Sequence, residues 1–229
     1  MSIWYKVLYQ IGLTPWEEDP ATSPAAEQVA ALFDREENGR EPTYGRALDL
    51  GCGSGIWSVE LAKRGWQVTG VDVVRKAIFK ARDRARTSGV EAEFVQGDIT
   101  DLRAAHLEPG FQFILDFECF NHLNPTQRRA VGREVTSVAA PGATMLMLVW
   151  SQGRRWPLPP GASRREIEEA FPEWMVIDEE FYTATSALPW WLRNAGLRFY
   201  RLRRNPPDGT PRQDDEQVAV ERSRESTSR

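Results

Sequence analysis

Short apolar runs alternate with segments of helical periodicity through the middle of the chain. Runs that end at glycine or aspartate predict buried strands, and apolar positions spaced by three and four residues predict amphipathic helices. The predicted strands cover residues 46–50, 67–71, 92–96, 112–117 and 144–150, and the predicted helices between them cover residues 56–64, 74–87 and 124–138. An earlier helix is expected to begin at Ser23 and Pro24, which suit the cap and the first helical position, and to run towards Gly39.

This alternation predicts an α/β fold with a doubly wound, mostly parallel seven-stranded sheet and right-handed crossovers. Pro141 and Gly142 predict a turn before the fifth strand. The end of the chain departs from the alternation, because residues 174–182 and 197–203 follow a helix over 163–171 with no long helix between them. Two such strands predict an antiparallel hairpin at the C-terminal edge of the sheet.

Composition divides the chain into three parts. Residues 1–22 are expected to form an N-terminal flap or helix, with Trp4, Leu8 and Ile11 at helical spacing, which either docks on its own domain or lies on a membrane surface. Residues 23–204 form the predicted main domain. Residues 205–229 are mostly polar and charged and have little to bury, which is typical of a disordered tail.

Charge and cysteine content narrow the expected partners. The net charge is −4, and the arginines are scattered among acids along the chain, so no nucleic-acid partner is expected. Cys52 and Cys119 are far apart and form no CxxC pair, which predicts neither a disulfide framework nor a metal site. We expect reduced thiols, a cytoplasmic location, no stable membrane insertion, and a monomer or a homodimer.

A glycine-rich turn follows the first predicted strand. Gly51, Gly53 and Gly55 let the backbone approach a ligand closely, and the following helix presents N–H groups and a partial positive charge. The dinucleotide pattern G-x-G-x-x-G requires glycine at position 56, where the chain has Ile56. Asp49 lies two residues before the first glycine, so the turn reads D-x-G-x-G-x-G.

Three more aspartates follow successive strands. Asp72 ends the second strand, Asp98 follows Gly97 after the third, and Asp116 ends the fourth. The carboxyl ends of parallel strands form the ligand-binding edge of an open α/β sheet. An acid at the end of the second strand can accept both hydroxyls of a ribose, and Asp49 with Asp116 can face a cation. An aspartate at the end of a strand, taken alone, is more often a turn former or a helix cap than a ligand contact.

These features resemble the motifs of class I S-adenosylmethionine-dependent methyltransferases over residues 46–150. Two flanking passages resemble a narrower group, the thiopurine, thiol, halide and tellurite methyltransferase-like enzymes. Residues 14–16 match its T-P-W element, and residues 116–123 are similar to its D-x-x-C-F-H-x-L segment, with Glu118 at a usually small position and Asn121 in place of histidine.

The resemblance implies a Rossmann-like methyltransferase fold with S-adenosylmethionine as cofactor. Asp98 would accept from the adenine amino group, Ile99 would pack on the ring, and Trp16 would lie against the cofactor. The residues expected to contact the cofactor are Trp16, Asp49, Gly51, Cys52, Gly53, Gly55, Asp72, Val73, Gly97, Asp98, Ile99, Asp116 and Phe117.

The expected acceptor is a small, aromatic or heterocyclic molecule that receives the methyl group on sulfur, oxygen or nitrogen, as in detoxification or secondary metabolism. His122 and Glu118 are the candidate bases. A capping or packing role is the more common one for a single histidine without a visible partner, and Glu118 can instead be a carboxylate that faces solvent. Aromatic residues in segments that can cover the cofactor predict an apolar pocket, and they are Tyr9, Phe117, Phe120, Trp150, Trp156, Phe181 and Trp190. Arg154, Arg155 and residues 157–160 are expected to form a lid.

Two other function classes stay open at this point. The first is a non-catalytic protein that keeps this fold and binds adenosylmethionine as a sensor or as an assembly subunit. An NAD-dependent oxidoreductase requires the missing third glycine and often a Tyr–Lys pair, which the sequence does not offer.

Overall fold

The computed structural model describes residues 25–153, 160–185 and 196–206. The helices are α2 (Ala26–Glu37), α3 (Ile56–Arg64), α4 (Arg75–Thr87), α5 (Pro125–Val138) and α6 (Arg164–Ala170), with short 3₁₀ helices η1 (Leu102–Ala105) and η2 (Phe120–His122). The strands are β1 (Gly45–Leu50), β2 (Trp66–Asp72), β3 (Glu93–Gln96), β4 (Phe111–Phe117), β5 (Ala139–Trp150), β6 (Trp174–Phe181) and β7 (Leu197–Arg204). Within these described ranges, every helix is too short or too polar to cross a bilayer.

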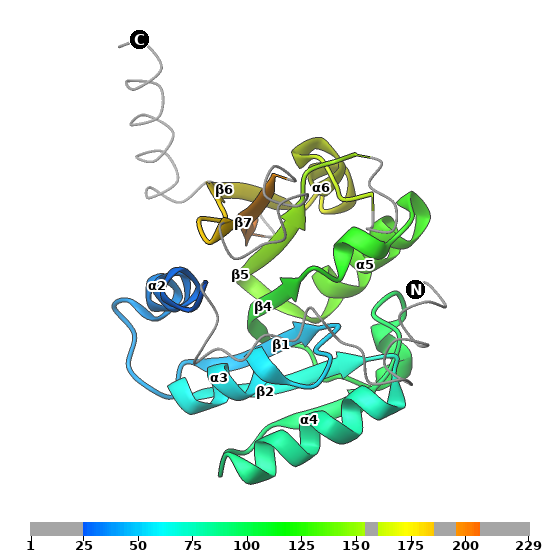
Figure 1. The fold of residues 1–229 in the computed structure, drawn as a ribbon. Coiled ribbons are helices and arrows are strands. Elements are labelled where there is room, and N and C mark those ends of the chain that lie inside the picture. The colour runs from blue at the N-terminus through cyan, green and yellow to red at the C-terminus, as the bar shows by residue number, and fades with distance from the viewer. Residues whose placement is uncertain (1–24, 154–159, 186–195, 207–229) are drawn as a thin grey trace.

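One seven-stranded sheet with the order β3-β2-β1-β4-β5-β7-β6 forms the centre of the molecule (Figure 1). The first five strands pair in parallel, and β7 pairs antiparallel with both β5 and β6. The predicted doubly wound, mostly parallel sheet with an antiparallel C-terminal edge pair is therefore confirmed. The last strand inserts between β5 and β6, so β6 forms the outer edge.

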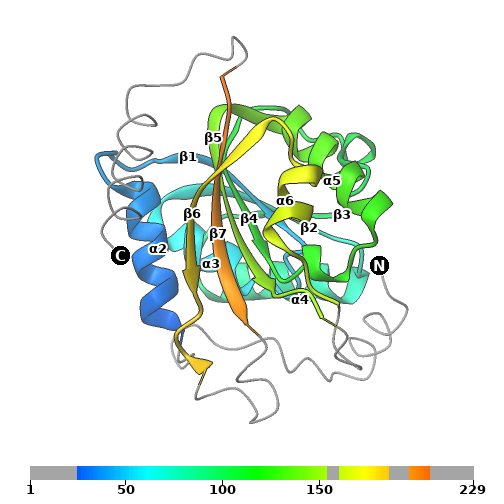
Figure 2. The same cartoon turned by 90° about the horizontal axis from the view of Figure 1, so that it is seen from above.

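Helices cover both faces of the sheet, with α2 on one side and α5 and α6 on the other (Figure 2). Alternate residues of a strand point to opposite faces. Leu48 of β1 therefore packs in the cluster that contains α5 and α6, whereas its neighbour Ala47 packs in the cluster that contains α2. Helix α4 joins α3 and β3 in a third cluster around Ile78 and Ala81. Both faces are thus buried, as a parallel sheet requires.

Local signals fix most element boundaries. Asn124 and Gln127 form the predicted capping box at the start of α5, with both reciprocal hydrogen bonds present. The prediction of a turn at Pro141 and Gly142 before the fifth strand is wrong, because both residues lie inside β5. The pairing with β4 is irregular there, and Gly142 has a φ of 72°, so a bulge accommodates the extra residues.

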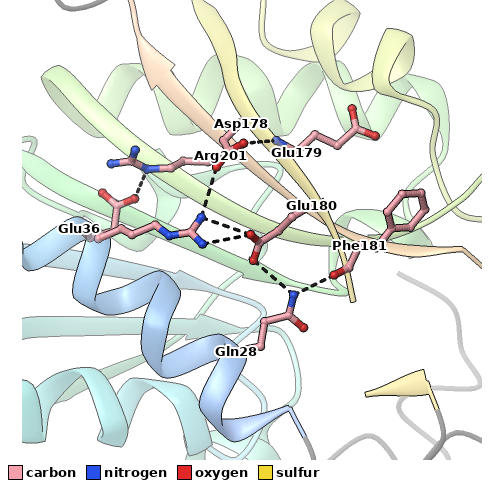
Figure 3. Close-up of polar contacts among 8 residues, drawn as sticks. Gln28, Glu36, Asp178, Glu179, Glu180, Phe181 and Arg201 are labelled. Atoms are coloured by element: carbon pink, nitrogen blue, oxygen red, sulfur yellow. Dashed lines mark hydrogen bonds and ion pairs between the residues drawn. The ribbon is translucent and has the colours of Figure 1, made fainter. Parts of the chain in front are cut away.

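Helix α2 is attached to the antiparallel strands by polar contacts (Figure 3). Gln28 Nε2 donates to the backbone oxygen of Phe181 at 2.8 Å, and Arg35 donates to Glu180 at 3.2 Å through both terminal nitrogens. Glu36 is buried and pairs with Arg201 of β7. These contacts hold the start of the domain against its end. The predicted cap residues Ser23 and Pro24 lie outside the described residues, and Ala25 is the N-cap of α2.

Candidate functional site

The turn between β1 and α3 contains three glycines in the left-handed region. The φ angle is 69° at Gly51, 54° at Gly53 and 75° at Gly55, where residues with a Cβ are strained. A Cβ at Gly51 would also lie 2.5 Å from Cys119 Sγ, so the turn packs directly against the loop after β4. Gly55 is the N-cap of α3, and the first N–H groups of that helix therefore open towards the carboxyl edge of the sheet.

Asp72 ends β2 and fixes the glycine turn in place. Its carboxylate accepts hydrogen bonds from the N–H of Gly53 at 3.1 Å and from the N–H of Val74 at 2.7 Å. The side chain is buried, and the following Val73 is half-buried. Asp72 therefore lies between the turn and the start of α4, and each carboxylate oxygen can accept more than one hydrogen bond.

Asp49 of β1 and Asp116 of β4 lie near the carboxyl ends of adjacent parallel strands. Asp49 is buried and accepts from Ser58 Oγ at 2.5 Å. Asp116 is 0% exposed, and one of its oxygens accepts from the N–H of Phe120 at 3.0 Å. The other oxygen, Oδ2, is buried and has no hydrogen-bond partner, which is costly in an interior.

Burial raises the pKa of both carboxyl groups. The pKa of Asp49 rises to about 7, with a smaller contribution from the negative charge of Asp72. The pKa of Asp116 also rises to about 7, and the charges of Asp49 and Glu118 add to the effect of burial. A cation bound between such groups would favour their ionised form. The site therefore favours a positively charged ligand.

Arg128 of α5 is a nearby cation, and burial lowers the pKa of its guanidinium, an effect that the charges of Glu166 and Asp116 offset only in part. Its guanidinium donates to Glu166 at 2.8 Å and to the backbone oxygen of Gly161 at 2.6 Å, and it stacks over Phe120. These contacts hold Arg128 in the interface between α5 and α6. None of them involves the Oδ2 atom of Asp116.

Cys52 and Cys119 belong to the same edge of the sheet. Burial raises the pKa of both thiols, and the surrounding carboxylates raise it further. Both side chains are therefore protonated at neutral pH and pack as small apolar groups rather than acting as nucleophiles. In the described ranges, no group of three or more His, Cys, Asp or Glu side chains is arranged to hold a metal ion.

The loop after β3 lies beside Asp72 but holds Asp98 in a local turn. Gly97 N donates to the backbone oxygen of Asp72 at 3.0 Å, which brings the loop to the same edge. The carboxylate of Asp98 is exposed and accepts from the N–H and the hydroxyl of Thr100 at 2.9 and 2.8 Å. Ile99 is only 3% exposed and packs in the main core, so its expected contact with an adenine ring stays a prediction.

The loop after β4 is strained and tied to β5. Glu118 has a φ of 68°, which is uncommon for a residue with a side chain, and strain of this kind is typical of functional loops. Asn121 is 0% exposed, and its Oδ1 accepts from the N–H of Trp150 at 3.0 Å. Its Nδ2 is buried without a partner. Asn121 therefore fixes the loop to the end of β5 through its amide oxygen.

The two candidate bases lie in this loop with different properties. Burial lowers the pKa of His122 to about 4, so its imidazole is neutral at pH 7 and binds a proton weakly. Glu118 is half-buried, and its negative charge contributes to the raised pKa of Asp116. Their catalytic roles stay predictions.

The aromatic residues expected around the acceptor are divided by the structure. Phe120 is fully buried and packs against Phe171, and Trp150 is 7% exposed, so both serve the core. Phe117 is half-buried and contacts Trp57 at a centroid distance of 5.3 Å. Phe181 is 62% exposed. Several expected site residues lie outside the described residues, and they are Tyr9, Trp16, Arg154, Arg155, Trp156, residues 157–159 and Trp190.

The sequence did not predict one side chain of the site, Ser58, or one contact, between Asn121 and Trp150. Ser58 hydrogen-bonds Asp49 from the first turn of α3, and its position three residues after Gly55 is the signal that could have found it. The link from Asn121 to Trp150 joins residues 29 positions apart and leaves no sequence signal.

A glycine turn that opens onto a helix N-terminus, with an acid at the end of the neighbouring strand, is typical of α/β proteins that bind nucleoside cofactors at a sheet edge. Sequence comparison matches residues 47–142 to a family described as methyltransferase domain. This region is a class I S-adenosylmethionine-dependent methyltransferase domain, as the motifs predict.

A relative from Caulobacter sp. (strain K31), named ubiquinone biosynthesis O-methyltransferase, is 34% identical over 53% of this chain and 47% of its own length. The chain thus spans about half the length of that relative. Among solved structures, the N-methyltransferase NodS from Bradyrhizobium japonicum WM9 is 19% identical and covers 82% of this chain and 93% of its own, with a TM-score of 0.65. The [4+2]-cyclase SpnF is 18% identical, and the match covers 89% of this chain and 94% of SpnF, with a TM-score of 0.68. These structures share the fold, whereas the reactions for which the two proteins are named differ.

Proposed function

We propose that the chain binds S-adenosylmethionine at the carboxyl edge of β1, β2 and β4 and transfers its methyl group to a small acceptor. The observation that carries this proposal is the convergence of Asp49, Asp72 and Asp116 on the glycine turn. Two of these carboxyls have a pKa raised to about 7, and one has an unpartnered oxygen. S-adenosylmethionine supplies two positive charges, an ammonium and a sulfonium, whereas NAD supplies a negative diphosphate that this edge would repel.

Each part of the site has an assigned role in this proposal. Asp72 accepts the ribose hydroxyls, and Asp98 accepts from the adenine amino group beside Val73, Gly97 and Ile99. The backbone of the glycine turn at Gly51, Cys52, Gly53 and Gly55 holds the carboxylate of the methionine moiety at the N-terminus of α3. Asp49 and Asp116 face the ammonium, and Trp16 and Phe117 cover the cofactor.

The transfer step requires little covalent assistance from the protein. The acceptor atom attacks the methyl carbon, a new bond to that carbon forms, and the carbon–sulfur bond breaks with its electron pair going to sulfur. The products are the methylated acceptor and S-adenosylhomocysteine, and the proton of a neutral acceptor leaves to a base or to water. Alignment of the acceptor with the methyl group supplies about 7–11 kcal/mol of the barrier reduction.

The properties of the candidate bases favour acceptors that ionise easily. A group with a pKa near 4, such as His122, removes a proton poorly from an alcohol or an amine. We therefore propose a thiol, a phenol or an acidic heterocycle as acceptor, with Glu118 or His122 orienting it. The named activity of the Caulobacter relative, an O-methyltransferase, is consistent with a phenolic oxygen as the accepting atom.

Calorimetric titration tests the cofactor assignment. The full chain is titrated with S-adenosylmethionine, S-adenosylhomocysteine and NAD under the same conditions. Saturable binding of the first two, with no heat from NAD, supports the proposal. Binding of NAD alone, or of none of the three, contradicts it.

Product analysis separates an enzyme from a non-catalytic binder of the same cofactor. The chain is incubated with S-adenosylmethionine and a panel of thiols, phenols and heterocycles, and the products are examined by mass spectrometry. A mass gain of one methyl group, dependent on the chain, supports transfer. Tight cofactor binding with no methylation of any acceptor supports a sensor instead.

A further inference from the structure

Helix α4 carries a basic stripe that the linear sequence conceals. Arg75, Phe79, Arg82 and Arg86 are spaced by four, three and four residues. With about 100° of rotation per residue, the four side chains fall within about 60° of one another around the helix axis. All four are exposed, although one terminal nitrogen of Arg82 donates to the backbone oxygen of Phe94 at 2.6 Å. The arginines that look scattered in the sequence are therefore gathered along one line of the surface.

The apolar centre of this stripe is unusual. Phe79 is 74% exposed, the highest value among the exposed large hydrophobic side chains of the described residues. Its neighbours one turn away on the same line are Arg75 and Arg82. The buried side chains of α4 are centred about 115° around the helix axis from the stripe, so the stripe runs along an exposed flank of the helix; they are Ala77, Ile78, Ala81 and Ala85. Figure 1 shows α4 at the periphery of the molecule, on the side of β2 and β3.

The charge of α4 opposes the charge of the rest of the chain. The helix contains six basic residues and one acidic residue, Asp83, whereas the whole chain has a net charge of −4. A local cationic surface on an acidic protein attracts an anionic partner to that surface. Asp83 pairs with Arg86 at 2.6 Å, but the guanidinium side chain is still 76% exposed and accessible to a partner.

We propose that the α4 stripe, defined as Arg75, Phe79, Arg82 and Arg86, binds reversibly to an anionic lipid surface. Guanidinium groups pair with headgroup phosphates, and the phenyl ring enters the boundary between headgroups and acyl chains. The stripe is a single line of side chains on one helix, and its central side chain, Phe79, offers no polar atom to a base. Both features favour a lipid surface over a nucleic acid.

Docking through this stripe has a consequence for the cofactor edge. Arg75 lies three residues after Asp72, at the end of α4 that faces the carboxyl edge of the sheet. A lipid surface in contact with the stripe would therefore lie beside the cofactor site. This arrangement suits an acceptor that partitions into the membrane.

Vesicle co-sedimentation of the full chain tests the proposal. Vesicles of phosphatidylcholine with and without phosphatidylglycerol are compared at low and high salt. We expect binding only to the anionic vesicles at low salt, because each arginine near such a surface adds about five-fold to partitioning. Phe79→Ala is expected to lower partitioning about ten-fold, and Arg75→Gln about five-fold.

Arg165→Gln is the matched control, because Arg165 is an exposed arginine of α6 with 87% side-chain exposure, far from the stripe in sequence. It should leave binding unchanged. The proposal is overturned if anionic vesicles do not bind the chain, if Phe79→Ala and Arg75→Gln bind as the unchanged chain does, or if Arg165→Gln weakens binding equally. Tighter binding to a single-stranded oligonucleotide than to anionic vesicles at the same salt also overturns it.

Discussion

Replacing Asp116 by asparagine removes a buried ionisable group and keeps the shape of the side chain. Because burial raises the pKa of Asp116 from 3.8 to about 7, the folded chain holds this proton more tightly than the unfolded chain does. Below pH 4 the carboxyl is protonated in both states and carries no penalty. As the pH rises from about 4 to about 7, the unfolded chain ionises first, and the free energy of unfolding falls.

The size of this effect follows from the pKa difference. About three units at 1.36 kcal/mol each correspond to about 4 kcal/mol as an upper limit, since Asp49 shares part of the proton affinity. Asp116→Asn has no carboxyl group at this position, so its free energy of unfolding does not fall for this reason as the pH rises. The stability of the variant relative to the unchanged chain should therefore increase by a few kcal/mol between pH 4 and pH 8, without ligand.

Urea unfolding followed by tryptophan fluorescence measures the difference at each pH. Asp98→Asn is the matched control, because it removes an exposed carboxylate at the same edge of the sheet. A stability difference for Asp116→Asn that stays constant from pH 4 to pH 8 would refute the reasoning. With S-adenosylmethionine added, the unchanged chain should become more stable than Asp116→Asn, because the ligand stabilises the ionised Asp116 and binds the variant more weakly.

Three further substitutions test the contacts of the site. Asp72→Ala should lower the affinity for S-adenosylmethionine by about 1–3 kcal/mol if the carboxylate accepts the ribose hydroxyls, and unchanged affinity by calorimetry would contradict that role. Gly51→Ala should unfold at lower temperature by calorimetry, because its Cβ would lie 2.5 Å from Cys119 Sγ at a φ of 69°; an unchanged transition would mean that the turn adjusts freely. Asn121→Ala should cost about 1–3 kcal/mol in urea unfolding, because the N–H of Trp150 loses its partner, and a neutral effect would show that water replaces the amide.

Local patterns predicted the parallel half of the fold well. Strands and helices from β1 to β4 begin and end within about one residue of their expected positions, because glycines, caps and apolar periodicity act over short distances. The convergence of Asp49, Asp72 and Asp116 also follows from sequence, since all three lie at or one residue before the carboxyl ends of parallel strands of one sheet.

Long-range contacts could not be predicted in the same way. The insertion of β7 between β5 and β6 depends on pairing between residues far apart in the chain. The attachment of α2 joins Gln28 to Phe181 across 153 positions, and neither residue type signals a partner. The burial that raises the pKa of Asp116 arises from packing by several elements, so the sequence indicates the carboxylate but not its proton affinity.

The basic stripe of α4 shows the same limit at shorter range. Counted along the chain, its arginines alternate with apolar and acidic residues and suggest no patch. The surface emerges only when helix geometry places Arg75, Phe79, Arg82 and Arg86 on one line.

A crystal structure of the chain with S-adenosylhomocysteine bound tests the central claim most directly. The account predicts the ribose hydroxyls within hydrogen-bond distance of Asp72, the adenine beside Asp98, and the amino group of the homocysteine moiety close to Asp49 and Asp116. A ligand bound away from the glycine turn, or a site in which these carboxylates contact only the protein, would contradict it.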